Sequence, residues 1–168
     1  MRNIVAVIVT LLLLFPLSSC DIASSNEESE YISPSKQAEN NLVTLVEAIN
    51  EQDVSAIKKL LSNYVVSNHE DIDSSICEML SFVDGEIVSY DEPFGSACGG
   101  AEKKDTGAKI KCFVTDKETE YYIAIKQWYS YDEQPEQIGV YNITIKNLSM
   151  LSRDPESPDA IFRLVKEN

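Results

Sequence analysis

The side chains that could perform acid–base chemistry here are a few carboxylates and one imidazole. Four of them stand where an ordered element is expected to end, namely Asp91, Glu92, Asp132 and His69. General acid–base catalysis needs such groups within hydrogen-bond reach of one substrate. However, Asp91 and Glu92 precede Pro93 in an expected loop, Asp132 begins the turn DEQP, and His69 lies in a polar connection. The spacing therefore predicts no catalytic pair.

The cysteines could form a disulfide or bind a metal. A hairpin that turns at residues 104–106 would set Cys98 opposite Cys112 on neighbouring strands, close enough for a disulfide. We expect these two residues to be adjacent, either as a disulfide or as neighbouring thiols, with Cys77 as a buried thiol on a helix. One histidine and no Cys-x-x-Cys pair are present. The sequence therefore predicts no metal site and no cofactor.

A fourth cysteine, Cys20, ends an apolar run. Met1-Arg2-Asn3 and the apolar stretch to Phe15 have the charge pattern and length of a secretory signal, which is too short to span a membrane. The run ends in Leu17-Ser18-Ser19-Cys20, which resembles the bacterial lipobox. That resemblance implies diacylglycerol on the Cys20 thiol and cleavage before Cys20. The alternative is ordinary secretion with an incidental cysteine. We expect residues 1–19 to be removed and the protein to be lipid-anchored at the cell membrane, outside the cytosol.

Charge and size limit the remaining chain. The 168 residues carry a net charge of −14, and the leader holds one basic residue, Arg2, and no acidic one. The mature protein is therefore more negative still, which argues against nucleic acid as a partner because phosphates would be repelled. Residues 20–35 are rich in Ser and Glu, so we expect a disordered tether. The chain beyond this tether is long enough for one domain with its own core.

Helical periodicity begins at Lys36. Apolar residues recur at three- and four-residue steps to Ile49, then again after Asp53, which can cap a second helix. A third helix is expected from about residue 71 to residue 83, and Gly85 is its stop signal. A short helix is expected over residues 158–165, inside a C-terminal tail that begins at residue 149.

After Gly85 the apolar period becomes two, as in strands. The expected strands are Glu86–Tyr90, Ala97–Glu102, Lys109–Thr115, Glu120–Trp128 and Gln137–Leu148. Turns centred between residues 117 and 118 and on residue 133 give the expected register: Val114 opposite Tyr121, Cys112 opposite Ile123, Ile110 opposite Ile125, then Ile125 opposite Tyr141, Ile123 opposite Ile143, and Tyr121 opposite Ile145. These positions share one apolar face, and lysines share the other. The pattern predicts an α+β fold, with N-terminal helices packed on a curved antiparallel sheet.

This order of elements resembles the cystatin-like cone of the nuclear-transport-factor-2-like superfold. Residues 36–148 look like an uncharacterised family of Firmicutes lipoproteins, known only as a domain of unknown function. The likeness is carried by NNLVTLVEAINEQDVSAIKKLLS, TDKETEYYIAIKQW and DEQPEQIGVYNITI. The resemblance implies a space between sheet and helices but carries over no functional residues. The tail, 149–168, lies outside it.

A pocket, if one is left, is expected near the strand ends. The residues expected to gather there are Tyr90, Asp91, Trp128 and Asp132, with Tyr121 and Tyr141 as the polar-tipped side chains of the inward face. Polar tips on apolar walls would orient a ligand. The leading hypothesis is a non-enzymatic binding domain for an unknown protein or small ligand. The alternatives are a small isomerase- or dehydratase-like enzyme and an immunity or inhibitor lipoprotein.

Overall fold

The computed structural model describes residues 32–99 and 103–164. Its helices begin where the sequence supplies caps. Helix α2 spans Pro34–Asn50, and the Ser33 hydroxyl accepts a hydrogen bond from the Lys36 amide. Helix α3 spans Val54–Leu60 behind Asp53, and helix α5 spans Ile72–Phe82 behind Asp71. In both, the cap carboxylate accepts from a first-turn amide, which confirms the expected starts.

One short helix was not expected. Helix α4 spans Asn63–Asn68, and the Ser62 hydroxyl accepts from the Val65 amide. The sequence placed a polar connection here, because six residues are too few for a clear apolar period. His69 is the C-terminal cap of α4.

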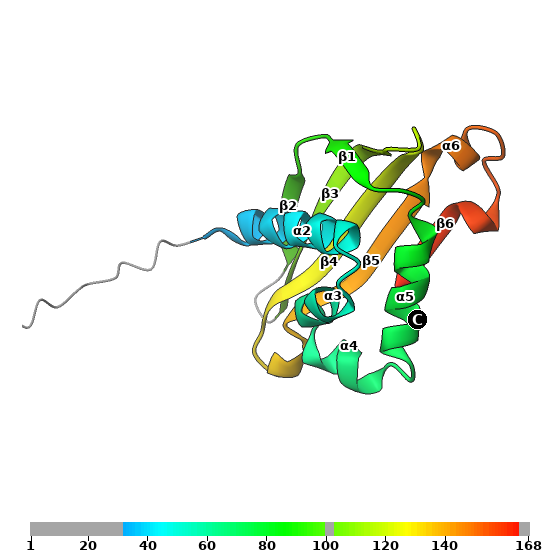
Figure 1. Ribbon diagram of the computed structural model, residues 1–168. Helices are drawn as coiled ribbons and strands as arrows, with labels where there is room; N and C mark the ends of the chain where they lie inside the picture. The colour runs from blue at the N-terminus through cyan, green and yellow to red at the C-terminus, as the bar shows by residue number, and fades with distance from the viewer. Residues whose placement is uncertain (1–31, 100–102, 165–168) are drawn as a thin grey trace, which may run out of the picture. The chain divides into compact units, whose positions relative to one another are not determined.

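The strands form one open antiparallel sheet. Among the described residues it has six strands in the order β1-β3-β4-β5-β6, with β2 also paired to β3. Their bounds are β1 Ile87–Tyr90, β2 Phe94–Gly99, β3 Lys103–Thr115, β4 Glu120–Tyr131, β5 Gly139–Asn147 and β6 Ile161–Leu164. Helices α2 and α3 lie over one face of this sheet, and α5 lies beside β6 (Figure 1). The fold is α+β with helices first, as the sequence predicts.

The core lies between the helices and the inner face of the sheet. From the sheet it takes Ile110, Ile123, Ile125, Ile143 and Ile145, all nearly fully buried, and from α2 Leu42, Leu45 and Ile49. These inward positions confirm the expected alternation. Side chains on the other face, which we call the outer face, point away from this core.

The register between β3 and β4 differs from the expected one. Ile110 lies opposite Ile123 and Phe113 opposite Tyr121, so two residues of β3 face one of β4. This β-bulge moves Phe113 into the core, where the sequence placed Cys112 and Val114. Cys112 and Val114 are only half-buried.

The register between β4 and β5 is shifted by two residues. Ile125 lies opposite Ile143, Ile123 opposite Ile145, and Tyr121 opposite Asn147. A shift of two residues keeps each side chain on the same face of the sheet. The isoleucines expected to point inward therefore still do so. A further irregularity follows Lys126, where Gln127 pairs with Val140. Tyr141 falls at this irregularity and is half-buried.

The expected neighbourhood of Cys98 and Cys112 is wrong. Cys98 pairs with Asp105, and Phe94 pairs with Lys109. The connection from β2 to β3 therefore follows Gly99, before the expected turn, and Cys112 lies seven positions beyond Asp105 on β3. Cys77 on α5 is exposed and not the buried thiol that was expected.

The C-terminal segment completes the sheet. After β5 come helix α6, Leu148–Leu151, and a 3₁₀ turn, η2, at Pro158–Ala160. Strand β6 then pairs with β5, so Ile145 lies opposite Phe162 and Thr144 opposite Arg163. The expected helix over residues 158–165 is thus a short turn and a strand.

No helix in the described ranges is both long and apolar enough to cross a membrane. The expected leader and Cys20 lie outside the described residues.

Candidate functional site

The outer face of the sheet is built from segments that repeat one pattern. GAKIK (107–111), YIAIK (122–126) and NITIK (142–146) come from the adjacent strands β3, β4 and β5, and IFR (161–163) comes from β6. In β4 and β5 isoleucines at alternate positions enter the core, as Ala108 and Ile110 do in β3 and Phe162 does in part in β6. The residues between them point outward. Lys109, Ala124, Thr144 and Arg163 are successive partners across the four strands. Tyr122, Lys146 and Ile161 make the next row.

A hollow of about 770 Å³ lies over these rows. We call it the outer-face hollow, and its lining consists of Tyr122, Ala124, Lys126, Asn142, Thr144, Lys146, Pro158, Ile161 and Arg163. Small side chains at Ala124 and Thr144 leave room, while longer side chains from the flanking rows form its walls. Pro158 of η2 closes the side next to β6.

The strand segments of the outer face have a charge opposite to that of the whole chain. The four segments contain five basic residues and no acidic one, although the chain carries −14. Residues 32–84, which hold the helices, contain nine acidic residues and three basic ones. The ion pairs Lys36–Glu39, Lys58–Asp73 and Lys117–Asp84 include no residue that lines the hollow. Positive charge is therefore concentrated around the hollow.

Local contacts hold the polar side chains of the hollow. The Lys146 ammonium lies 5.4 Å from the centre of the Tyr122 ring, which is within cation–π range. The Thr144 hydroxyl donates to Asn142 Oδ1 at 3.1 Å. Asn142 is buried although it belongs to the polar face. The hollow thus presents ammonium and guanidinium groups beside amide and hydroxyl groups, a set that binds anions.

The residues expected to share a pocket are separated by the fold. Trp128 and Tyr141 do meet, with stacked rings 5.0 Å apart between centres, and Trp128 also contacts Tyr131 edge-on. Asp132 is exposed and accepts a hydrogen bond from Ser130. This end of β4 therefore brings together some of the residues expected in the pocket, but not Tyr90, Asp91 or Tyr121.

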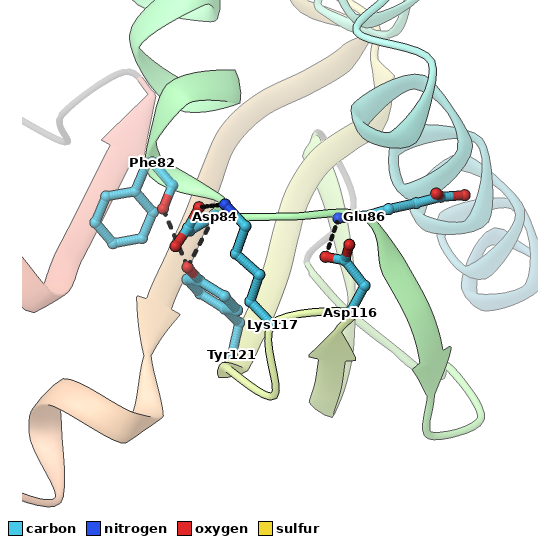
Figure 2. A network of polar contacts seen from close by, with 6 residues as sticks. All are labelled: Phe82, Asp84, Glu86, Asp116, Lys117 and Tyr121. Carbon is cyan, nitrogen blue, oxygen red and sulfur yellow. Dashed lines mark hydrogen bonds and ion pairs between the residues drawn. The ribbon is translucent and has the colours of Figure 1, made fainter.

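Tyr121 lies seven positions from Trp128 on β4 and belongs to a different network (Figure 2). Its hydroxyl accepts from the Asp84 amide at 2.9 Å and donates to the Phe82 carbonyl at 3.3 Å. Asp84 also pairs with Lys117. Burial raises the pKa of the Tyr121 phenol above its usual range. The network joins the end of α5 to the β3–β4 turn and is structural.

Tyr90 and Asp91 lie at the β1 edge, away from Trp128. Tyr90 pairs with Phe113 on β3, whereas Trp128 pairs with Asp105 near the opposite end of that strand. Burial raises the pKa of the Cys112 thiol, and the charges of Glu120 and Asp91 add to this. The expected single pocket is therefore wrong. Among the described residues, no three His, Cys, Asp or Glu side chains gather as metal ligands would.

The outer-face hollow was missed as a site. The lysines of β3, β4 and β5 are visible in the sequence as a polar face. The signal that could have located the hollow is the Ile-x-Ile-Lys segment that β4 and β5 share, together with Ala-Lys-Ile-Lys in β3. Arg163 could not be added, since its segment was expected to be helical.

A comparison with known families gives a match over the same elements. The family model of a domain of unknown function, DUF5104, matches residues 44–151, more than half of the chain. The chain belongs to the DUF5104 family. The DUF5104 match begins within α2 and ends with α6, so it includes β3, β4 and β5 but not β6. No curated protein matches the sequence.

Proposed function

We propose that this protein is a lipid-anchored, extracytoplasmic, non-enzymatic binding domain that holds an anionic ligand in the outer-face hollow. One observation carries the proposal: three cations line a concave surface whose strand segments contain no acid, in a chain of charge −14. The volume of about 770 Å³ lies within the range of small-molecule sites, about 300–1,000 Å³.

The chemistry of the lining supports an anion. Lys146 and Arg163 supply charged donors on neighbouring strands, and Thr144 supplies a hydroxyl directly opposite Arg163. Hydrogen bonds between such cations and carboxylate or phosphate oxygens are stronger than those between neutral groups. Because the chain as a whole is acidic, anions are repelled by most of its surface and attracted to the cations of the hollow.

An enzyme that works between helices and sheet is the first alternative. In residues 32–99 and 103–164 the buried polar side chains are Ser62, Thr106, Thr115, Gln127 and Asn142. General acid–base catalysis in that interior would use a titratable side chain. This set holds none, and the buried phenol of Tyr121 is engaged by the Asp84 amide and the Phe82 carbonyl. We therefore favour binding at the outer face over catalysis in the interior.

An inhibitor or immunity lipoprotein is the second alternative. The excess of acidic residues in the helical segment 32–84 favours a basic partner on that side. This function would use the helices, whereas the outer-face hollow would use the sheet. Substitutions on the helices and substitutions in the hollow therefore distinguish the inhibitor function from anion binding.

The anchor and the finer fold also belong to the proposal. The lipobox-like Leu17-Ser18-Ser19-Cys20 supports a diacylglycerol thioether at Cys20, as in Firmicutes lipoproteins. Helices over one face of an open antiparallel sheet support a nuclear-transport-factor-2-like cone. Two acyl chains would hold the domain at the membrane stably, whereas one chain gives only reversible binding.

Calorimetric titration of the full-length protein in neutral detergent micelles tests the binding function. The probes are citrate and pyrophosphate, with glucose as a neutral control. The double variant Lys146→Gln/Arg163→Gln is expected to weaken binding by about tenfold or more, because each charge-assisted hydrogen bond contributes about 1.5–3 kcal/mol. The matched control, Lys59→Gln/Arg153→Gln, removes the same charges from exposed positions that do not line the hollow and should bind normally. Equal loss in both double variants would show that only net charge matters and would contradict the proposed site.

A further inference from the structure

Two smaller hollows extend the outer-face hollow across the sheet. One, of about 170 Å³, shares Tyr122, Ala124 and Lys126 with it and reaches Lys109 and Phe94. The other, of about 480 Å³, shares Phe94 and Lys109 with the first and continues to Asp91, Glu92 and Lys111. We call the three together the outer-face groove. It crosses the strands β2, β3, β4, β5 and β6 in turn.

The groove is long enough for an extended peptide. Neighbouring strands are about 4.8 Å apart, so four spacings give a length of roughly 19 Å. An extended chain rises about 3.3 Å per residue, and the groove therefore accommodates about six residues.

The chemistry changes along the groove. At the β5–β6 end the lining is cationic, with Lys146 and Arg163. Where the groove reaches β2, Phe94 has 59% of its surface exposed, and the Lys109 ammonium lies 5.7 Å from its ring centre. At the far end Asp91 and Glu92 add negative charge beside Lys111. The order is cationic, then apolar, then mixed.

We propose that the outer-face groove binds an acidic peptide segment of a partner protein, which lies across the strands and places one apolar side chain on Phe94. This inference rests on the proposed function, because it names an acidic peptide as the anionic ligand. A phosphate polymer would match the cations but would gain nothing from Phe94 and would be repelled by Asp91 and Glu92. A peptide satisfies all three parts, with acidic residues at β5–β6, an apolar side chain at β2, and neutral or basic residues beyond it.

Fluorescence anisotropy with labelled probes tests the inference on the full-length protein in neutral detergent micelles. The first probe is a peptide of about eight residues, the groove length plus flanks, with four acidic residues, one leucine and a terminal lysine. The second replaces the leucine by glycine, and the third is polyphosphate of similar length. We expect the first peptide to bind about tenfold more tightly than the second, because burying a leucine contributes about that factor.

Variants distinguish the contribution of Phe94 in the groove from that of the cations in the hollow. Phe94→Ala should abolish the advantage of the leucine peptide and leave the glycine peptide unchanged. The matched control is Tyr64→Ala, which removes another exposed aromatic ring, on α4. Lys146→Gln/Arg163→Gln should weaken both peptides, and circular dichroism should show that each variant is folded.

Each other outcome has a separate meaning. Equal binding of both peptides and polyphosphate, unaffected by Phe94→Ala, would overturn the peptide inference but leave the anion site intact. No binding of any anionic probe would overturn the proposed function as well. Concentration-dependent sedimentation that Lys146→Gln/Arg163→Gln abolishes would identify a second copy, through its acidic helical side, as the occupant and would also overturn the inference.

Discussion

The side-chain amide of Asn41 on α2 donates a hydrogen bond of 2.7 Å to the Gln127 Oε1 on β4, across 86 residues of chain. Gln127 has 2% of its surface exposed and lies opposite Val140, on the core face of the sheet. A buried amide without a partner is costly, and this bond offsets that cost while joining the first helix to a central strand.

Removing the donor should therefore destabilise the domain. Asn41→Ala leaves the Gln127 oxygen buried without Asn41, and we expect the free energy of unfolding to fall by about 1–3 kcal/mol. Urea unfolding followed by circular dichroism measures this change. Asn40→Ala, at an exposed position on the same helix, should change it by less than about 0.5 kcal/mol. Similar losses in both variants would show that helix propensity, and not the buried bond, is responsible.

The Tyr121 hydroxyl should contribute to stability through its bonds to the Asp84 amide and the Phe82 carbonyl. Tyr121→Phe keeps the ring stacked on Phe113 but removes these bonds, and we expect a loss of about 1 kcal/mol. The control is Tyr122→Phe, on the outer face of the same strand. If both variants unfold at the wild-type urea concentration, the network does not stabilise the fold.

Tyr121 also predicts an alkaline loss of stability. Because burial raises its pKa in the folded state, its contribution is fully present below the unfolded pKa, about 10, and is lost as pH rises through the folded pKa. Urea midpoints measured from pH 8 to pH 11 should fall less steeply in Tyr121→Phe than in the wild type. Parallel curves would contradict the burial of the phenol.

Glu39 should contribute stability that is lost in acid. Its carboxylate accepts from the Lys36 ammonium at 3.1 Å and from the Gly95 amide at 3.0 Å, which joins α2 to β2. These bonds hold the pKa of Glu39 below its usual 4.5, so the contribution is present above 4.5 and disappears as pH falls through the folded value. Glu39→Gln should reduce the acid loss of stability between pH 6 and pH 3, whereas Glu47→Gln, at an exposed position on α2, should not.

Cys20 predicts the cellular location. Cys20→Ala should move the protein from the membrane fraction to the soluble or secreted fraction and abolish labelling by a fatty-acid analogue. Cys77→Ala, which removes an exposed thiol from α5, is the control and should leave both unchanged. Normal fractionation and labelling of Cys20→Ala would show that the lipobox interpretation is wrong.

Local signals predicted much of the fold. The capping residue Asp53 located the start of α3, and helical periodicity placed α5 from about residue 71. Alternation placed Ile123, Ile125, Ile143 and Ile145 in the core. Both signals depend only on residues that are neighbours in the sequence, so long-range pairing does not alter what they predict.

Longer-range features could not be predicted in this way. The bulge at residues 111–112 depends on pairing with β4, so nothing nearby reveals that Phe113 replaces Cys112 in the core. Cys98 was misplaced because the expected turn at residues 104–106 lies inside β3. Strand β6 was missed because four residues do not distinguish a strand from a helix. Without β6, Arg163 could not be placed beside Thr144.

The repeated segments GAKIK, YIAIK and NITIK have a consequence for how this sequence can change. Within each, the isoleucine before the final lysine belongs to the core and that lysine belongs to the outer face, one position apart. Natural drift or a combinatorial library can therefore replace the lysines while the isoleucines keep the hydrophobic interior closed. Related chains could display different outer faces on a common scaffold, and specificity could diverge without the fold being rebuilt.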